Sequence, residues 1–146
     1  MNKSNLESFY AIADIAATQW YQRKCRYGSY KGPAWSESAK RRLTDSKAMT
    51  FRKPNFKHQR GYIAFLHAIA NSESGVKRRA LCELFNLKSV SLTTDNLQYA
   101  GLINLDTKYT HKFTITPFGR AYLALAERAR PELEILAQAE ELKKLM

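Results

Sequence analysis

Two short stretches decide the fold: residues 97–103 read Leu-Gln-Tyr-Ala-Gly-Leu-Ile, and residues 114–121 read Thr-Ile-Thr-Pro-Phe-Gly-Arg-Ala. In the first stretch a glycine, Gly101, follows an apolar helical repeat, which is typical of a helix C-terminus. In the second, Thr116 followed by Pro117 is typical of a helix start, because the hydroxyl accepts a free N–H and proline needs none there. The residues between them alternate in polarity and predict a β-hairpin.

Upstream of the hairpin, apolar residues recur at helical spacing and predict three helices. These helices are expected over residues 56–70, 76–85 and 88–100. Downstream, a long helix begins after Thr116 and breaks or kinks at Pro131. Three helices, a hairpin and a long helix, in that order and at those lengths, predict a mainly α protein with a small β-hairpin, a winged helix-turn-helix.

Both opening stretches resemble motifs of the MarR-type and related bacterial winged-helix regulators, and the likeness covers roughly residues 56–129. The first is similar to the Leu-x-x-x-Gly-Leu-Ile that ends the family's recognition helix, and the second to its Leu-Thr-x-x-Gly-Arg-Ala motif after the wing. The resemblance implies a DNA-binding regulator. The chain departs from the pattern at Thr93 and Thr94, where the family has apolar residues, and in a shorter preceding turn, which together predict a rotated or late-starting recognition helix.

A helix is also expected on each side of this domain. Ser4 and Glu7 form a capping-box pattern ahead of an apolar stripe over residues 4–24, and a second stripe follows over residues 131–146. Their apolar surplus predicts either a homodimer interface or packing on the chain's own domain. The expected divisions are an N-terminal dimerisation helix (1–25), a basic arm (26–55), the winged helix-turn-helix (56–129) and a C-terminal helix (130–146).

Positive charge is concentrated in one segment. Residues 22–60 hold twelve Lys and Arg against two acids, which is +10 of a net +11. Charge segregated in this way indicates a polyanionic partner. Within the segment, a short helix near 34–48 is expected to turn Lys40, Arg41 and Lys47 outward.

The resemblance and the charge together predict contacts with double-stranded DNA. Asn96 and Gln98 are the strongest candidates for reading bases, since their amides match the edge of adenine. The full expectation for base contacts is Ser89, Ser91, Thr93, Asn96 and Gln98. For the DNA backbone it is Lys77, Arg78, Arg79, Lys88, Lys108, His111 and Lys112, with Lys40, Arg41 and Arg42 from the arm. The alternative for either group is a solvated polar surface.

Other classes of protein find less support. Cys25 and Cys82 lie far apart and no His stands at metal-ligand spacing, so no metal, cofactor or catalytic site is expected and the protein is not expected to be an enzyme. Without an apolar leader or a membrane-spanning stretch, a cytoplasmic location is expected. The prediction is a sequence-specific, dimeric transcriptional regulator. The alternatives are a winged-helix adaptor for a protein partner, or a non-specific or single-stranded nucleic-acid-binding protein.

Overall fold

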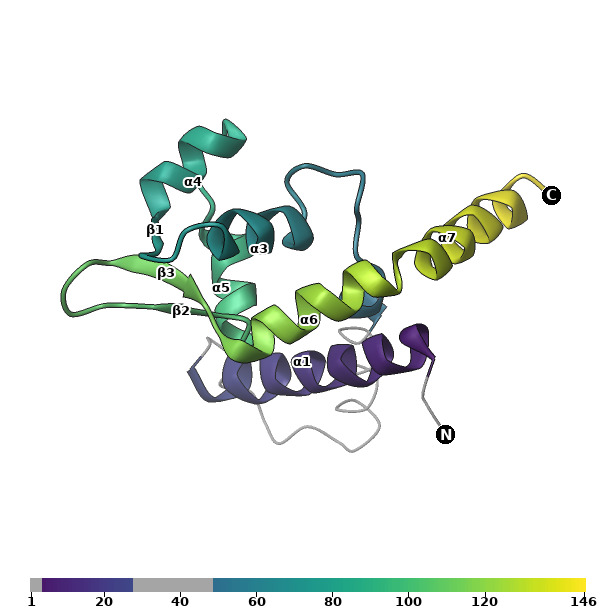
Figure 1. Ribbon diagram of the computed structural model, residues 1–146, viewed down its shortest axis with the longest axis horizontal. Coiled ribbons are helices and arrows are strands. Elements are labelled where there is room, and N and C mark those ends of the chain that lie inside the picture. Colours follow the sequence, from purple (N-terminus) through teal and green to yellow (C-terminus); the bar gives the residue numbers. More distant parts are fainter. Residues whose placement is uncertain (1–3, 28–48) are drawn as a thin grey trace.

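The computed structural model describes residues 4–27 and 49–146, with side chains for 4–24 and 49–146 (Figure 1). Over this part of the chain the protein is mainly helical, with one small antiparallel sheet, as the sequence predicts. The helices are α1 (Asn5–Tyr27), α3 (Tyr62–Ala70), α4 (Arg78–Phe85), α5 (Ser91–Tyr99), α6 (Pro117–Arg128) and α7 (Arg130–Lys144), and residues 49–52 are helical too. The strands are β1 (Val76–Lys77), β2 (Ile103–Leu105) and β3 (Lys112–Ile115).

The sheet has the order β1-β3-β2, so the predicted hairpin of β2 and β3 is confirmed and a third strand joins it. The placement of Val76 and Lys77 in the second helix was wrong. Gly75, at φ +97°, turns the chain so that Val76 pairs with Phe113, and helix α4 begins only at Arg78. A side chain at position 75 would press against Lys112 and Phe113, so this turn depends on glycine.

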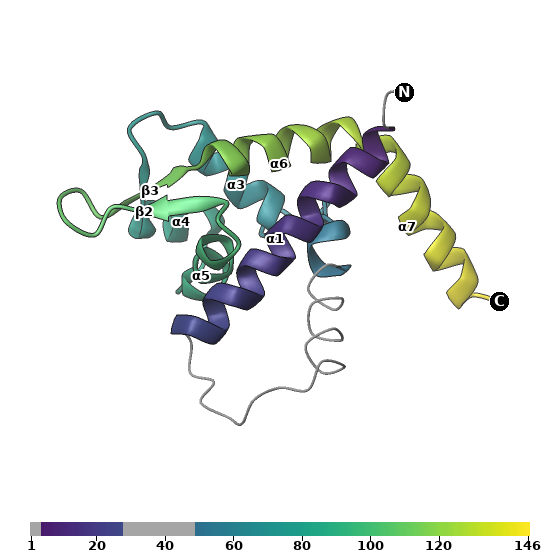
Figure 2. The same cartoon turned by 90° about the horizontal axis from the view of Figure 1, so that it is seen from below.

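Helix α1 packs on its own domain. The Ser4 side chain caps it by accepting the Glu7 N–H at 3.1 Å, as the capping pattern predicts. Its buried face carries Phe9, Ala13, Ala16, Ala17 and Trp20, and it lies against α5 and α6 (Figure 2). Small side chains let the helices approach closely, and the large rings fill the space at either end of the contact. Of the two uses expected for this stripe, packing within the domain therefore holds for most of it.

The two motifs that open the sequence analysis meet at one corner. Gly101 adopts φ +80° after α5, and the Leu102 N–H closes the helix end on the Leu97 carbonyl at 2.9 Å. Thr116 caps α6, with its hydroxyl accepting the Gly119 N–H at 2.8 Å and donating to the Gly101 carbonyl at 2.7 Å. Both predicted caps are confirmed, and the threonine links the end of α5 to the start of α6.

Two predicted helix boundaries were too early. The segment 55–61 forms turns, in which the Asn55 side chain accepts the N–H groups of Lys57 and His58, so α3 begins at Tyr62 and not at residue 56. Asn86 is left-handed at φ 53° and ends α4, and the next helix begins at Ser91 and not at residue 88. The late start of α5 agrees with the expectation drawn from its departure from the family pattern.

The predicted arm, 26–55, is wrong at both ends. Helix α1 continues to Tyr27, and residues 49–53 belong to the folded body. Phe51 is buried, its carbonyl accepts the Tyr122 hydroxyl at 2.8 Å, and Arg52 pairs with Asp14 at 2.7 Å. The rest of the arm, including the short helix expected near 34–48, lies outside the described residues.

Helix α7 extends away from the body after the break expected at Pro131 (Figures 1 and 2). Leu133 is buried at its base, and Lys53 pairs with Glu140 at 2.7 Å along its length. The other large apolar side chains of the helix are exposed: Ile135, Leu136 and Leu142. This helix therefore presents an apolar surface that the described part of the chain leaves uncovered.

We expect Gly119→Ala to destabilise the protein. A Cβ at this position would overlap the Leu102 carbonyl oxygen and crowd Ile115, and a backbone atom has little room to move aside. Overpacking of this kind costs about 1–3 kcal/mol of unfolding free energy. Urea unfolding followed by circular dichroism measures it.

Gly61→Ala is the matched control, since the nearest atom to its Cβ would be the His58 carbonyl oxygen at 3.3 Å. Its midpoint should fall less than that of Gly119→Ala, because a shift of a few tenths of an ångström relieves this contact. Equal midpoints for Gly119→Ala and the wild type would show that the corner at Thr116 is not tightly packed.

Candidate nucleic-acid interface

Two lysines lie opposite each other on the neighbouring strands β1 and β3. The β1–β3 register places Lys77 directly opposite Lys112, although the two residues are 35 positions apart in the sequence. Like charges at such a position repel each other and destabilise the pairing of the strands. No acidic side chain among the described residues pairs with either lysine. The pair is thus a site where an external anion would relieve repulsion.

The start of α4 adds to this positive edge. Arg78 is exposed and its guanidinium lies 5.5 Å from the centre of the Phe113 ring, which holds it beside the lysine pair. No side chain caps this end of α4, so its first backbone N–H groups face outward with the positive end of the helix dipole. Arg79 is also exposed but is shared with Glu83 on its own helix, at 3.4 Å. Three of the residues expected to contact the DNA backbone therefore lie close together: Lys77, Arg78 and Lys112.

The wing tip is a loop organised by one carboxylate. Asp106 accepts the backbone N–H groups of Lys108, Tyr109 and Thr110, at 3.0–3.3 Å, and the Thr110 hydroxyl at 2.8 Å. These bonds lower the pKa of Asp106 to about 2, the backbone bond to Thr110 being the main cause. His111 closes the loop in a left-handed conformation at φ 54°.

The loop exposes the expected contacts Lys108 and His111, together with Tyr109, whose residue is 83% exposed. The sequence reasoning missed Tyr109, although an aromatic residue between basic neighbours in a polar turn was a signal for it. A tyrosine here could stack on a sugar or a base while its neighbours meet phosphates.

Helix α5 is oriented by contacts with α1 and α3. The Asn96 side chain accepts the Trp20 indole N–H at 2.9 Å and donates to the Tyr62 hydroxyl at 3.1 Å. At the end of the helix, Arg23 donates to the Gln98 carbonyl at 3.1 Å. Asn96, one of the two strongest predicted base readers, is therefore turned inward and bridges three helices; its amide is engaged within the protein.

The threonines that depart from the family pattern have different environments. Thr94 is fully buried, and its hydroxyl donates to the Val90 carbonyl at 3.0 Å, so it occupies an apolar position without an unsatisfied polar group. Thr93 is half-buried. The remaining predicted base readers are at least partly accessible: Ser89, Ser91, Thr93 and Gln98.

The outer face of α5 has few groups suited to DNA. Leu92 is 75% exposed and Asp95 is exposed, and neither is among the residues predicted to contact DNA. The expected contact Lys88 is exposed just before the helix. A leucine can contact a thymine methyl group, but an exposed aspartate beside phosphates is unfavourable. This face offers little affinity of its own.

Two of the basic residues in the segment 22–60 form ion pairs within the protein. Arg52 and Lys53 pair with Asp14 and Glu140. Lys57 and Arg60 are exposed. The arm residues expected to touch the DNA backbone, Lys40, Arg41 and Arg42, lie outside the described residues.

Within residues 4–24 and 49–146, His, Cys, Asp and Glu side chains form no group of three that could hold a metal ion. Cys82 is a free, half-buried thiol. None of the helices in the described ranges combines the length and apolarity that crossing a membrane requires. Comparisons with protein-family models, curated proteins and solved structures yield no match to this chain. The likeness to MarR-type regulators therefore rests on the residues of the two motifs alone.

We expect the wing to lose order in acid. Because the folded-state pKa of Asp106 is about 2 and its ordinary value is 3.8, the carboxylate stabilises the loop above about pH 4, and this contribution is lost as the pH falls toward 2. NMR titration of the Thr110 amide should report a midpoint near 2. In Asp106→Ala the amides of Lys108 to Thr110 should exchange with solvent faster than in the wild type above about pH 4. A midpoint near the ordinary value would contradict the hydrogen bonding at this turn.

Proposed function

We propose that the protein is a cytoplasmic, DNA-binding transcriptional regulator that acts on double-stranded DNA through its winged helix. The order of its elements, with α4 and α5 as the helix-turn-helix and β2–β3 as the wing, supports this assignment. The similarity of both motifs to MarR-type regulators supports it as well.

The observation that carries the proposal is the facing pair Lys77 and Lys112, flanked by Arg78. A protein that only needed a stable sheet would gain by placing an acid opposite one of these lysines. A phosphate between them would remove the repulsion, and the open N-terminus of α4 would donate to a second phosphate nearby. The lysine pair belongs to the wing and the helix start together, so one backbone segment could contact both.

Backbone contacts would then supply most of the affinity. The accessible residues for selectivity are Ser89, Ser91, Thr93 and Gln98, which are short or uncharged, with Lys88 as the neighbouring base. Each side chain of this kind contributes less discrimination than an arginine that binds guanine with two hydrogen bonds. We therefore expect modest sequence preference and a strong dependence of affinity on salt.

The double variant Lys77→Ala/Lys112→Ala tests the lysine pair. Each lost phosphate contact lowers the slope of log affinity against log salt concentration by about 0.9, so loss of the one phosphate between the lysines should lower the slope by about 1. Fluorescence anisotropy with a random-sequence duplex at several salt concentrations measures it.

Arg120→Ala/Arg128→Ala removes the same charge from exposed positions of α6 and is the control; its slope should match the wild type. An unchanged slope for the lysine-pair variant, or an equal fall in slope for the variant and its control, would contradict the assignment of the site. The triple change of Lys40, Arg41 and Arg42 to Ala measures separately what the segment outside the described residues adds.

The regulator is proposed to be a homodimer held by α7. Ile135, Ala139 and Leu142 are exposed and alternate in spacing by four and three residues, as in a coiled coil. Charged residues of both signs flank this stripe, with Glu132 and Glu134 toward the start of the helix and Glu140, Glu141, Lys143 and Lys144 toward its end.

Leu142→Glu should therefore shift the protein from dimer to monomer. A glutamate at this position places a charge in the apolar contact, and light scattering at micromolar concentration measures the mass. Ala137→Glu adds the same charge away from the stripe and should leave the mass unchanged. A monomeric wild type would refute the dimer.

A protein partner is the second candidate function, favoured by Leu92 and Asp95 on the outer face of α5. An exposed leucine beside an acid suits a protein surface better than phosphates. Capture from a nuclease-treated lysate by wild type, but not by Leu92→Glu, would support this adaptor role over DNA binding.

A further inference from the structure

The wing tip presents an aromatic side chain at its end. Tyr109 is 83% exposed, and within residues 4–24 and 49–146 no group hydrogen-bonds to its hydroxyl and no other ring contacts it. Figures 1 and 2 show the loop between β2 and β3 extending beyond the rest of the body. The Tyr109 side chain therefore adds nothing to the core and is accessible to a partner.

The loop that carries Tyr109 is held in one shape. Asp106 accepts the backbone N–H groups of Lys108, Tyr109 and Thr110, as well as the Thr110 hydroxyl. The Asp106 N–H in turn donates to the Lys112 carbonyl at 3.1 Å, which closes the loop at its base. A side chain on a loop that is already ordered loses less entropy on binding than one on a loop that must first be ordered. The tyrosine is thus preorganised for a contact.

The ring stands among groups suited to nucleic acid. Lys108 and His111 are exposed beside it, and Lys112 of the lysine pair follows three residues later. Three residues of chain span at most about 10 Å. A strand whose phosphate lies between Lys77 and Lys112 would therefore pass within reach of the Tyr109 ring.

An intact duplex offers this ring little. Bases within a duplex stack on their neighbours, so a protein reaches only their edges from the grooves. Tyr109 has neither the guanidinium of an arginine nor the amide of an asparagine, the groups that bind those edges with two hydrogen bonds. An aromatic ring gains most by lying flat against the face of a base, and that face is open where the base is unpaired.

We infer that the wing tip is a binding site for an unpaired base beside duplex DNA, with Tyr109 stacked on the base and the lysine pair on the adjacent backbone. The inference rests on the proposed function, in which the lysines hold the duplex, and it adds the class of DNA that is bound best. A base bulged from a duplex and a base in a single-stranded overhang share this chemistry. Selectivity then depends on the structure of the DNA more than on its sequence.

Fluorescence anisotropy of the full chain compares three duplexes of one sequence: intact, with one extra unpaired base near the middle, and with a short single-stranded overhang. The wild type should bind the second and third about tenfold more tightly than the first, the usual gain from one stacked base. Preference for only one of them would support the inference and identify the form of the unpaired base. Equal affinity for all three would overturn the inference and leave duplex binding as proposed.

Two changes at position 109 separate stacking from hydrogen bonding. Tyr109→Ala should remove the preference, while its affinity for the intact duplex stays close to that of the wild type. Tyr109→Phe keeps the ring and loses the hydroxyl, so the preference should remain. Equal losses in both variants would show that the hydroxyl binds a phosphate, and would overturn stacking. Thr107→Ala changes another exposed side chain of the same loop and is the control, which should behave like the wild type.

NMR gives a second readout on the wild type. The Tyr109 ring protons should move upfield when the bulged duplex is added, because a stacked base shields them, and should stay in place with the intact duplex. The absence of such a shift would overturn the inference. Binding to unpaired DNA but not to the intact duplex would overturn the duplex-binding proposal alone, and binding to none of the three would overturn both.

Discussion

The packing of α1 against α5 and α6 is the constraint on which most of this structure depends. A face of alanines between Phe9 and Trp20 brings the helices close and uses most of the apolar surface of α1 inside the chain. Trp20 then holds Asn96, and Arg23 holds the carbonyl at the end of α5, so α1 sets the rotation of α5. The same contact limits what α1 can offer a second copy, whereas Ile135, Leu136 and Leu142 of α7 remain exposed for the proposed dimer.

With α5 held in this rotation, the residues proposed to bind phosphates and those proposed to contact bases lie on different parts of the surface. The turn at Gly75 and the register of β1 with β3 gather Lys77, Arg78 and Lys112 on one edge. Their positive charges repel one another, and a bound anion would relieve this repulsion. The outer face of α5 carries Leu92, Asp95 and short polar side chains instead. The proposed regulator would therefore hold phosphates strongly and distinguish sequences weakly, a balance set by where the charges lie and not by how many there are.

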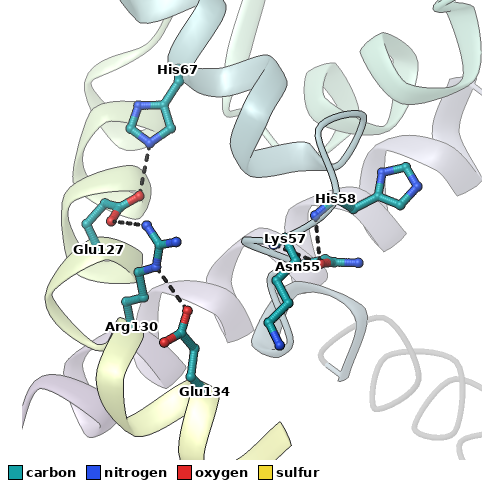
Figure 3. Close-up of polar contacts among 7 residues, drawn as sticks. All are labelled: Asn55, Lys57, His58, His67, Glu127, Arg130 and Glu134. Carbon is teal, nitrogen blue, oxygen red and sulfur yellow. Dashed lines mark hydrogen bonds and ion pairs between the residues drawn. The ribbon is translucent and has the colours of Figure 1, made fainter. Parts of the chain in front are cut away.

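Ion pairs within the folded body reduce the positive charge that residues 22–60 can offer a partner. Arg52 and Lys53 belong to the charge of residues 22–60, yet they fasten the chain after residue 49 to α1 and α7. Exposed pairs of this kind contribute little stability singly, but they remove those charges from any external partner. At the α6–α7 junction, Glu127 is shared between His67 and Arg130, so these charges too are paired within the protein (Figure 3).

The sequence by itself determined the order of the elements and the ends that depend on local hydrogen bonds. Gly101, Thr116 and Pro117 act on neighbours within a few residues, so their caps could be predicted from the chain alone. Only the tertiary structure decided that Asn96 faces Trp20, 76 positions away, and that Lys77 faces Lys112 across a strand pair. The sequence pattern around a polar helical residue is the same whether its side chain faces solvent or a distant donor. Long-range packing decides between the two, and periodicity does not encode that packing.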